Sequence, residues 1–149
     1  MKIEEEIKQT KFQSPFQKVS INLLFTASWL DANNNKFFKE FGITNQQFNI
    51  LRILRGQHPN SISGASIKER MLDRNSDISR LLDRLILKKY ITKTKCESDK
   101  RAADVKITPE GLKLLTKIDK RIEEIDTNFL KLTAKEAKQL SDLLDKCRG

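Results

Sequence analysis

Positively charged side chains are concentrated in one short stretch of this sequence. Residues 84–106 contain eight Lys or Arg and three Asp or Glu, a net charge of +5, while all 149 residues together carry +9. A basic cluster binds polyanions because each phosphate contact releases condensed counterions. The stretch therefore predicts contact with a nucleic acid in preference to a membrane surface. The basic side chains expected to reach it are Arg84, Lys93, Lys95, Lys100 and Arg101.

The residues just before this stretch predict a helix with two chemically different faces. Over residues 76–88, the helical repeat places one set of side chains inside: Ile78, Leu81, Leu82 and Leu85. The opposite face presents the polar set Ser76, Ser79, Arg80, Asp83 and Arg84. Ser and Arg can contact base edges and phosphates in a DNA groove, whereas we expect Asp83 to pair with Arg80 or Arg84.

The side chains that catalysis or metal binding would need are absent from the sequence. His58 is the only histidine, and Cys96 and Cys147 are the only cysteines, so the ligands for a zinc site are missing. There is no glycine-rich phosphate loop and no nucleophile paired with a base. We therefore expect a protein that is not an enzyme and that has no metal and no cofactor.

Several features of the sequence favour a cytoplasmic location. No stretch reaches the roughly 18 uninterrupted apolar residues that a membrane span needs. Residues 1–6 are acidic and have no apolar segment, unlike a signal peptide. Cys96 and Cys147 form no disulfide framework, which fits a reducing compartment.

The elements that position the basic stretch are mostly helices. Residues 1–14 are expected to form a loosely held polar arm. Periodicity and caps predict helices over about 15–41, 44–56, 63–71, 76–88, 109–130 and 133–149. Two strands, 90–95 and 103–107, flank a charged tip. The predicted fold is mainly α with a small β-hairpin wing, a winged helix-turn-helix with N- and C-terminal dimerisation helices.

The apolar stripes of the terminal helices are longer than one small lobe can cover. The predicted stripe of residues 109–130 comprises Leu112, Leu115, Ile118, Ile122, Ile125 and Phe129. In the last helix, the side chains expected inside are Leu140, Leu143 and Leu144. A two-fold axis lets such stripes cover each other, so we expect a homodimer. In this single domain, residues 15–41 and 109–149 would form the dimer and residues 42–108 the DNA-binding lobe.

Four segments in this order resemble the MarR family of bacterial transcriptional regulators, from about residue 20 to the end. They are Ile43–Leu54, Ser76–Leu85, Asp99–Arg101 and Ile107–Gly111. The resemblance implies a dimer on pseudo-palindromic DNA operators, often under the control of a small molecule or an oxidant. We expect a repressor that a small-molecule effector releases. It also implies that Asp99 orients Arg101, which enters the minor groove.

Two positions depart from the family pattern. Lys93 stands where the family usually has Arg, which keeps the charge and loses the fork geometry. Lys89 stands where the family usually has Gly at the end of the recognition helix. A left-handed non-glycine residue costs roughly 1–2 kcal/mol, so we expect this turn to be built differently.

The aromatic residues have two possible roles. Seven of the eight Phe lie in residues 1–48, together with Trp29. Phe25, Trp29 and Phe48 either line a pocket for a small, flat, anionic aromatic effector or belong to a hydrophobic dimer core, the interpretation we favour. The chain as a whole also has an alternative function, as a helical module that docks an acidic protein. The Ser and Arg helix face and the Asp99–Arg101 pair favour double-stranded DNA.

Overall fold

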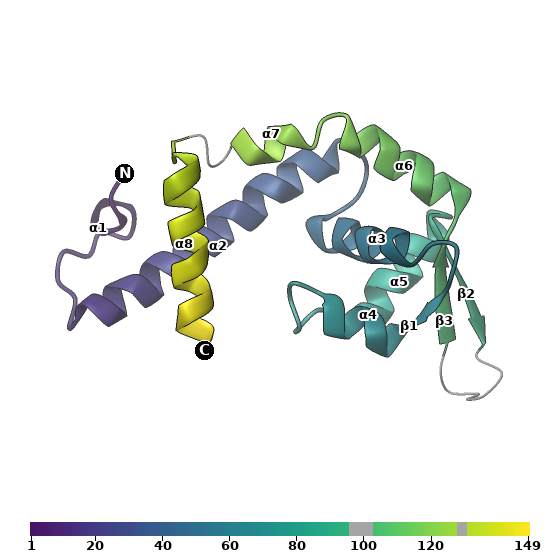
Figure 1. The fold of residues 1–149 in the computed structure, drawn as a ribbon, viewed down its shortest axis with the longest axis horizontal. Coiled ribbons are helices and arrows are strands. Elements are labelled where there is room, and N and C mark those ends of the chain that lie inside the picture. The colour runs from purple at the N-terminus through teal and green to yellow at the C-terminus, as the bar shows by residue number, and fades with distance from the viewer. Residues whose placement is uncertain (96–102, 128–130) are drawn as a thin grey trace.

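The computed structural model describes residues 1–95, 103–127 and 131–149. Its helices are α1 (Ile3–Glu6), α2 (Pro15–Lys39), α3 (Asn45–Gln57), α4 (Gly64–Arg70), α5 (Ile78–Leu87), α6 (Pro109–Asp119), α7 (Glu123–Asp126) and α8 (Ala134–Arg148). Its strands are β1 (Ile62–Ser63), β2 (Ile91–Lys95) and β3 (Ala103–Ile107). In Figure 1, α3, α4, α5 and the sheet form a lobe, and α2 extends away from it toward α1. The predicted fold class, mainly helical with a small β wing, is confirmed.

One hydrophobic core holds the lobe together. Side chains from α3, α4, α5, the sheet and α6 meet in it, and several of them have no exposed surface: Ile50, Leu51, Ile67, Leu85, Val105 and Leu115. These residues follow the helical and strand periods of the sequence, because each element buries one face against the others. The core therefore fixes α5 and the wing as parts of one body.

Side-chain caps start the helices where the sequence predicts. At α3, the Thr44 hydroxyl accepts from the Gln47 N–H at 3.2 Å, and the Gln47 side chain accepts from the Thr44 N–H at 3.0 Å. The same reciprocal pair forms between Thr133 and Glu136 at α8. Thr108 caps α6 by accepting from the Gly111 N–H at 3.1 Å. The caps locate these helix starts independently of tertiary packing.

The sheet has a third strand that the sequence analysis missed. β1 pairs with β3 through Ile62 opposite Val105 and Ser63 opposite Asp104, so the strand order is β1-β3-β2. A two-residue strand is too short to show a period of two, and only its tertiary partner identifies it. β1 leads directly into α4, so it ties the start of that helix to the wing.

The predicted continuous helix over residues 109–130 is wrong. α6 ends at Asp119, and the chain then winds more tightly, with the Arg121 N–H bonding to the Ile118 carbonyl three residues back at 2.9 Å. The apolar spacing continues through this turn, which is why periodicity did not show the break. Phe129 lies outside the described residues.

Arg121 connects the turn between α6 and α7 to the end of α2. Its guanidinium donates to Glu124 at 2.6 and 2.9 Å and to Glu40 at 2.7 Å. It also lies 5.5 Å from the ring centre of Phe37 and 5.4 Å from that of Phe41. The two carboxylates, Glu124 first, raise the pKa of Arg121. Ion pairing and cation–π contact thus join α2 to the helices that follow the wing.

The N-terminal residues are more ordered than the predicted arm. They include the short helix α1, in which Ile3 is buried. The Glu4 carboxylate pairs with the Lys18 ammonium on α2, which lowers the pKa of Glu4. Lys18 also lies 5.7 Å from the ring centre of Phe12. The expectation of a loosely held arm is therefore wrong, because these contacts hold residues 1–14 against α2.

The leucines predicted to lie inside the last helix are not covered by this chain. Leu140 is 44% exposed and Leu143 is 59% exposed, while Leu144 is partly buried. The helix itself forms where expected, between the Thr133 cap and Gly149. Its stripe lacks a partner because α8 does not belong to the core of the lobe. The prediction that these leucines are buried is wrong for a single chain.

Lys89 closes α5 with the left-handed turn that we expected the chain to avoid. Its φ is +62°, its N–H bonds to the Ile86 carbonyl at 2.9 Å, and the Tyr90 N–H bonds to the Leu85 carbonyl at 3.1 Å. Both hydrogen bonds of a Schellman motif are therefore present. The Lys89 carbonyl accepts from the Thr108 hydroxyl at 2.7 Å, which links this turn to the start of α6. The expectation of a different turn is therefore wrong: Lys89 adopts the left-handed conformation that favours glycine.

Lys89→Gly should stabilise the fold. Relief of a left-handed non-glycine residue is worth roughly 1–2 kcal/mol. The extra chain entropy of glycine costs roughly 0.5–1 kcal/mol, so we expect a net gain of up to about 1.5 kcal/mol. Urea unfolding at a fixed protein concentration measures it. Lys89→Ala is the control, since it removes the same charge and keeps the Cβ. An equal gain in both variants would attribute the effect to charge and contradict a conformational cause.

Candidate nucleic-acid interface

A small polar network holds the turn that leads into α5. The Ser76 hydroxyl donates to the Asp73 carbonyl at 2.8 Å, and the Gln46 amide on α3 donates to the Ser76 hydroxyl at 3.1 Å. Asp77 caps α5 by accepting from the Arg80 N–H at 3.2 Å. Ser76 is only 6% exposed and precedes the helix. The prediction that it lies on the exposed face of the helix is wrong, since its hydroxyl serves this turn.

The outward face of α5 carries the other predicted side chains. Ser79, Arg80, Asp83 and Arg84 are exposed, opposite the buried apolar stripe of this helix. Arg80 lies 3.7 Å from the carboxylate of Asp77, and no ion pair joins Asp83 to Arg80 or Arg84 among the described residues. The expected role of Asp83 is therefore wrong. An exposed ion pair of this kind is weak, so Arg80 can exchange Asp77 for another anion.

The wing turns the two lysines of β2 toward the α5 side. Lys93 pairs with Val105 and Lys95 with Ala103 in the antiparallel ladder, two and four residues from the buried Ile91. Because alternate residues share one face of a strand, Lys93 and Lys95 lie on the same face as Ile91. This face is apolar at the base of the wing, where it joins the core, and basic farther out.

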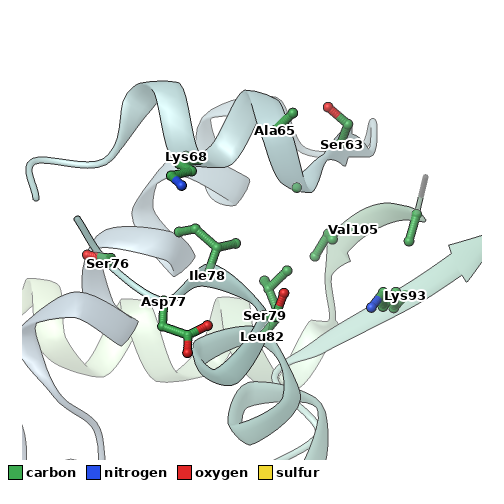
Figure 2. Close-up of a pocket in the computed structure, with 12 residues that line it drawn as sticks. Ser63, Ala65, Lys68, Ser76, Asp77, Ile78, Ser79, Leu82, Lys93 and Val105 are labelled. Carbon is green, nitrogen blue, oxygen red and sulfur yellow. The ribbon is translucent and has the colours of Figure 1, made fainter. Parts of the chain in front are cut away.

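A cavity of about 530 Å³ separates the start of α5 from the wing. Figure 2 shows Lys68 of α4 and Lys93 of β2 on opposite sides of it, with Ser79 between them and Asp77 below Lys68. Ser63 and the backbone of Gly64 complete its rim near β1. The cavity is open to solvent and combines two ammonium groups with hydroxyl donors, a combination suited to phosphate oxygens.

Lys68 and Ser63 are site residues that the sequence analysis missed. Lys68 follows the buried Ile67 on α4, so it must point outward, but nothing in its spacing distinguishes it from an ordinary surface lysine. Ser63 is the N-cap of α4 and accepts from the Ser66 N–H at 3.1 Å. The structure identifies Lys68 and Ser63 as candidate site residues because β1 and α4 lie next to the wing at this cavity.

The tip of the wing lies outside the described residues. Asp99, Lys100 and Arg101 all fall in residues 96–102, as does Cys96. Their predicted roles in DNA binding stay predictions. The part of the candidate interface that the structure does describe comprises Ser79, Arg80, Arg84, Lys93 and Lys95, with Lys68 and Ser63 beside them.

The three aromatic residues of the predicted effector pocket have different surroundings. Phe48 stacks on Phe38, with 4.3 Å between ring centres, and packs against the core. Phe25 and Trp29 are 37% and 42% exposed on α2. None of the three lines any of the five cavities described in this structure. A pocket formed by these side chains within one chain stays a prediction without geometric support.

Residues 1–95, 103–127 and 131–149 contain no group of three His, Cys, Asp or Glu side chains that could hold a metal ion. Over the same ranges, no helix has the length and hydropathy required to cross a membrane. Cys147 is exposed and makes no disulfide.

Comparison with known proteins identifies relatives among transcriptional regulators. A model of the MarR family matches residues 43–103. The HTH-type transcriptional regulator PecS of Dickeya dadantii (strain 3937) is 26% identical over 110 residues, covering 73% of this chain and 66% of PecS. The HTH-type transcriptional regulator PapX of Escherichia coli is 25% identical over 83 residues, covering 56% of this chain and 51% of PapX. The chain thus matches between about half and two thirds of the length of these relatives.

Solved structures extend the similarity to nearly the whole chain. A MarR transcription factor from Planctomyces limnophilus is 30% identical, with a TM-score of 0.70, over 91% of this chain and 98% of its own. The fold is also shared with a mutant of MarR from E. coli, crystallised with operator DNA, at 23% identity and a TM-score of 0.80 over 93% of this chain and 99% of that one. The predicted resemblance is confirmed, and the chain belongs to the MarR family of transcriptional regulators.

Proposed function

We propose that this protein is a sequence-specific, double-stranded DNA-binding regulator. The observation that carries the proposal is the juxtaposition of two surfaces: the exposed Ser79, Arg80 and Arg84 face of α5 and the Lys93 and Lys95 face of β2. They flank one open cavity that also contains Lys68. Three consecutive elements, α4, α5 and β2, thus direct polar and cationic groups toward the same region.

The two surfaces suit different parts of DNA. A single α-helix fits the major groove, which is about 12 Å wide, and Arg is a common donor to guanine there. A basic strand beside that helix reaches the neighbouring phosphates, where Lys acts as a point charge. On this proposal α5 selects the sequence, while Lys68, Lys93 and Lys95 supply affinity. Binding then weakens steeply as the salt concentration rises.

The acting unit is proposed to be a homodimer held by the terminal helices. The part of α2 remote from the lobe exposes Phe16 (83%), Leu24 (72%) and Val19 (58%) in the single chain. α8 adds the exposed Leu140 and Leu143. Monomeric proteins rarely leave so much contiguous apolar surface in water. A symmetric pairing of residues 15–41 and 109–149 would cover it and would present two copies of α5 to a pseudo-palindromic site.

The proposed mode of regulation is repression with release by a small molecule. α2 belongs to the proposed dimer contact and also packs against α3 of the lobe through Phe38 and Phe48. A ligand that favours one arrangement of α2 against the lobe would change the spacing of the two copies of α5. Only a ligand with different affinities for the two arrangements shifts that equilibrium.

Arg80→Ala tests the proposed function. On duplexes that the wild type selects from a random pool, the variant should lose roughly 1–3 kcal/mol of binding free energy and much of its preference over the unselected pool. The reason is that Arg80 lies on the outward face of α5 and its side chain is 81% exposed. Fluorescence anisotropy at fixed salt, with poly-glutamate as competitor, provides both affinities.

Arg148→Ala is the matched control for this experiment. Arg148 also pairs with an Asp three residues earlier, Asp145, but on α8. Its loss should leave the preference for selected duplexes unchanged. An Arg80→Ala variant that keeps the wild-type preference would contradict the assignment of this helix face. Displacement of DNA by poly-glutamate at equal charge concentration would instead support an acidic protein partner.

Leu24→Glu tests the proposed dimer. A charge on the exposed apolar face of α2 should shift sedimentation at micromolar concentration from dimer toward monomer, because it would be desolvated in the interface. Leu87→Glu is the control, since Leu87 is 82% exposed on α5 of the lobe. It should sediment as the wild type does. A wild-type chain that is monomeric with native circular dichroism would refute the dimer.

A further inference from the structure

A cavity between α2 and the helix-turn-helix has a lining unlike that of the rest of this basic chain. Its volume is about 390 Å³. Its lining residues come from α2, α3 and the turn after α4, and they include Leu30, Asp31, Asn34, Asn49, Met71 and Asp73. The four other cavities described in the structure each include at least one lysine. This cavity has two carboxylates, no Lys and no Arg, so its local charge is opposite to that of the chain.

Neutral amides hold both carboxylates in place. The Asp31 carboxylate accepts from the side-chain amides of Asn45 and Asn35, each at 2.9 Å. The Asp73 carboxylate accepts from the Gln46 side chain at 3.2 Å and from the Asn75 N–H at 2.9 Å. Amide donors orient a carboxylate without cancelling its charge. Neither Asp has a salt bridge to a described residue.

Two further polar atoms of the lining lack partners. Asn49 is only 5% exposed, and its side-chain oxygen accepts from the Leu72 N–H at 3.2 Å. Its side-chain nitrogen is buried and makes no hydrogen bond within the described part of the chain. The same is true of the side-chain oxygen of Asn34. Buried polar atoms are nearly always paired, so each unpaired one calls for an explanation. Asn49 lines this cavity and none of the other four described, so a ligand acceptor for its side-chain nitrogen would lie here.

We propose that this cavity binds a small organic cation that has N–H donors and an oxygen acceptor. An amidinium or guanidinium group would donate to the carboxylates of Asp31 and Asp73 in charge-assisted hydrogen bonds. A hydroxyl or carbonyl oxygen would accept from Asn49. The apolar part of the lining, including Leu30 and Met71, suits a flat hydrocarbon body. The anionic ligand expected from the net charge of the chain would be repelled here.

The cavity is connected to the start of α5 by hydrogen bonds already in place. The Gln46 amide donates both to the Asp73 carboxylate and to the Ser76 hydroxyl, and Ser76 in turn donates to the Asp73 carbonyl. A cation on Asp73 would compete with Gln46 for the same oxygen. Its binding would therefore alter the turn that positions α5, a consequence that rests on the DNA-binding function proposed above.

Three probes of one shape test the site: 4-hydroxybenzamidinium, 4-hydroxybenzamide and 4-hydroxybenzoate. They place a cationic, neutral or anionic group on the same ring. In ¹H–¹⁵N NMR titrations of the full chain, the amidinium should cause saturable shifts of the Leu72 amide and the Asn49 side-chain amide. The neutral amide should bind about tenfold more weakly, because its hydrogen bonds are not charge-assisted. The benzoate should cause no saturable shift.

Matched variants separate this cavity from general charge effects. Asp31→Asn, which leaves the Asp73–Gln46 bond intact, should weaken amidinium binding about tenfold, and Asp31→Asn with Asp73→Asn should abolish it. Asp83→Asn with Asp142→Asn removes the same charge elsewhere and should leave binding unchanged. Equal binding of the benzoate, unchanged affinity in Asp31→Asn, or no saturable shift with any probe would overturn the proposal. The last result would mean that only water occupies the cavity. No DNA is present, so loss of the DNA-binding proposal would not affect this result.

Discussion

Burial of the apolar stripe of α5 is the constraint on which the candidate interface depends. Ile78, Leu81, Leu82 and Leu85 are all at most 9% exposed and pack into the core with α3, α4 and the sheet. With these four side chains inside, helical geometry leaves Ser79, Arg80 and Arg84 facing outward. The same core contains Ile91 and Val105 at the base of the wing. Hydrophobic burial thus sets both the orientation of the helix and the side on which the wing lysines lie.

The terminal helices differ from the lobe in how much apolar surface they expose to water. The lobe covers most of its apolar side chains, with Leu72 and Leu87 as exceptions, whereas α2 and α8 leave many of theirs exposed. Arg121 joins these two regions, since it bonds to Glu40 at the end of α2 and to Glu124 on α7 and packs over Phe37. A second copy of the chain can bury this exposed apolar surface, while the well-packed lobe stays folded beside it. The contacts of Arg121 also give the proposed dimer a route by which a change at α2 can reach the lobe.

Local signals in the sequence were sufficient for much of the fold. Capping boxes at Thr44 and Thr133 placed two helix starts, and the change from helical to strand periodicity located the wing. Features that depend on tertiary contact were not predictable in this way. β1 has only two residues and exists through its pairing with β3, and the break after Asp119 interrupts hydrogen bonds without interrupting the apolar spacing.

The candidate site was predictable to a similar extent. The outward position of Arg80 follows from the stripe beside it, so periodicity predicted it correctly. Ser76 has the right residue type and spacing, but the N-cap is Asp77, and the Ser76 hydroxyl is used inside the preceding turn. Lys68 is indistinguishable from other surface lysines until β1 and α4 bring it to the cavity opposite Lys93. Lys89 shows that an unfavourable residue can occupy a left-handed turn when surrounding hydrogen bonds fix the backbone.

The sequence of the DNA that the protein selects from a random duplex pool tests the central claim most directly. Two outward-facing copies of α5 related by a two-fold axis should enrich an inverted repeat whose half-site centres are about 10–10.5 base pairs, one helical turn, apart. Two chains should bind each selected duplex. Enrichment of a single asymmetric half-site, or recovery of the pool without enrichment, would contradict a dimer that reads DNA through α5.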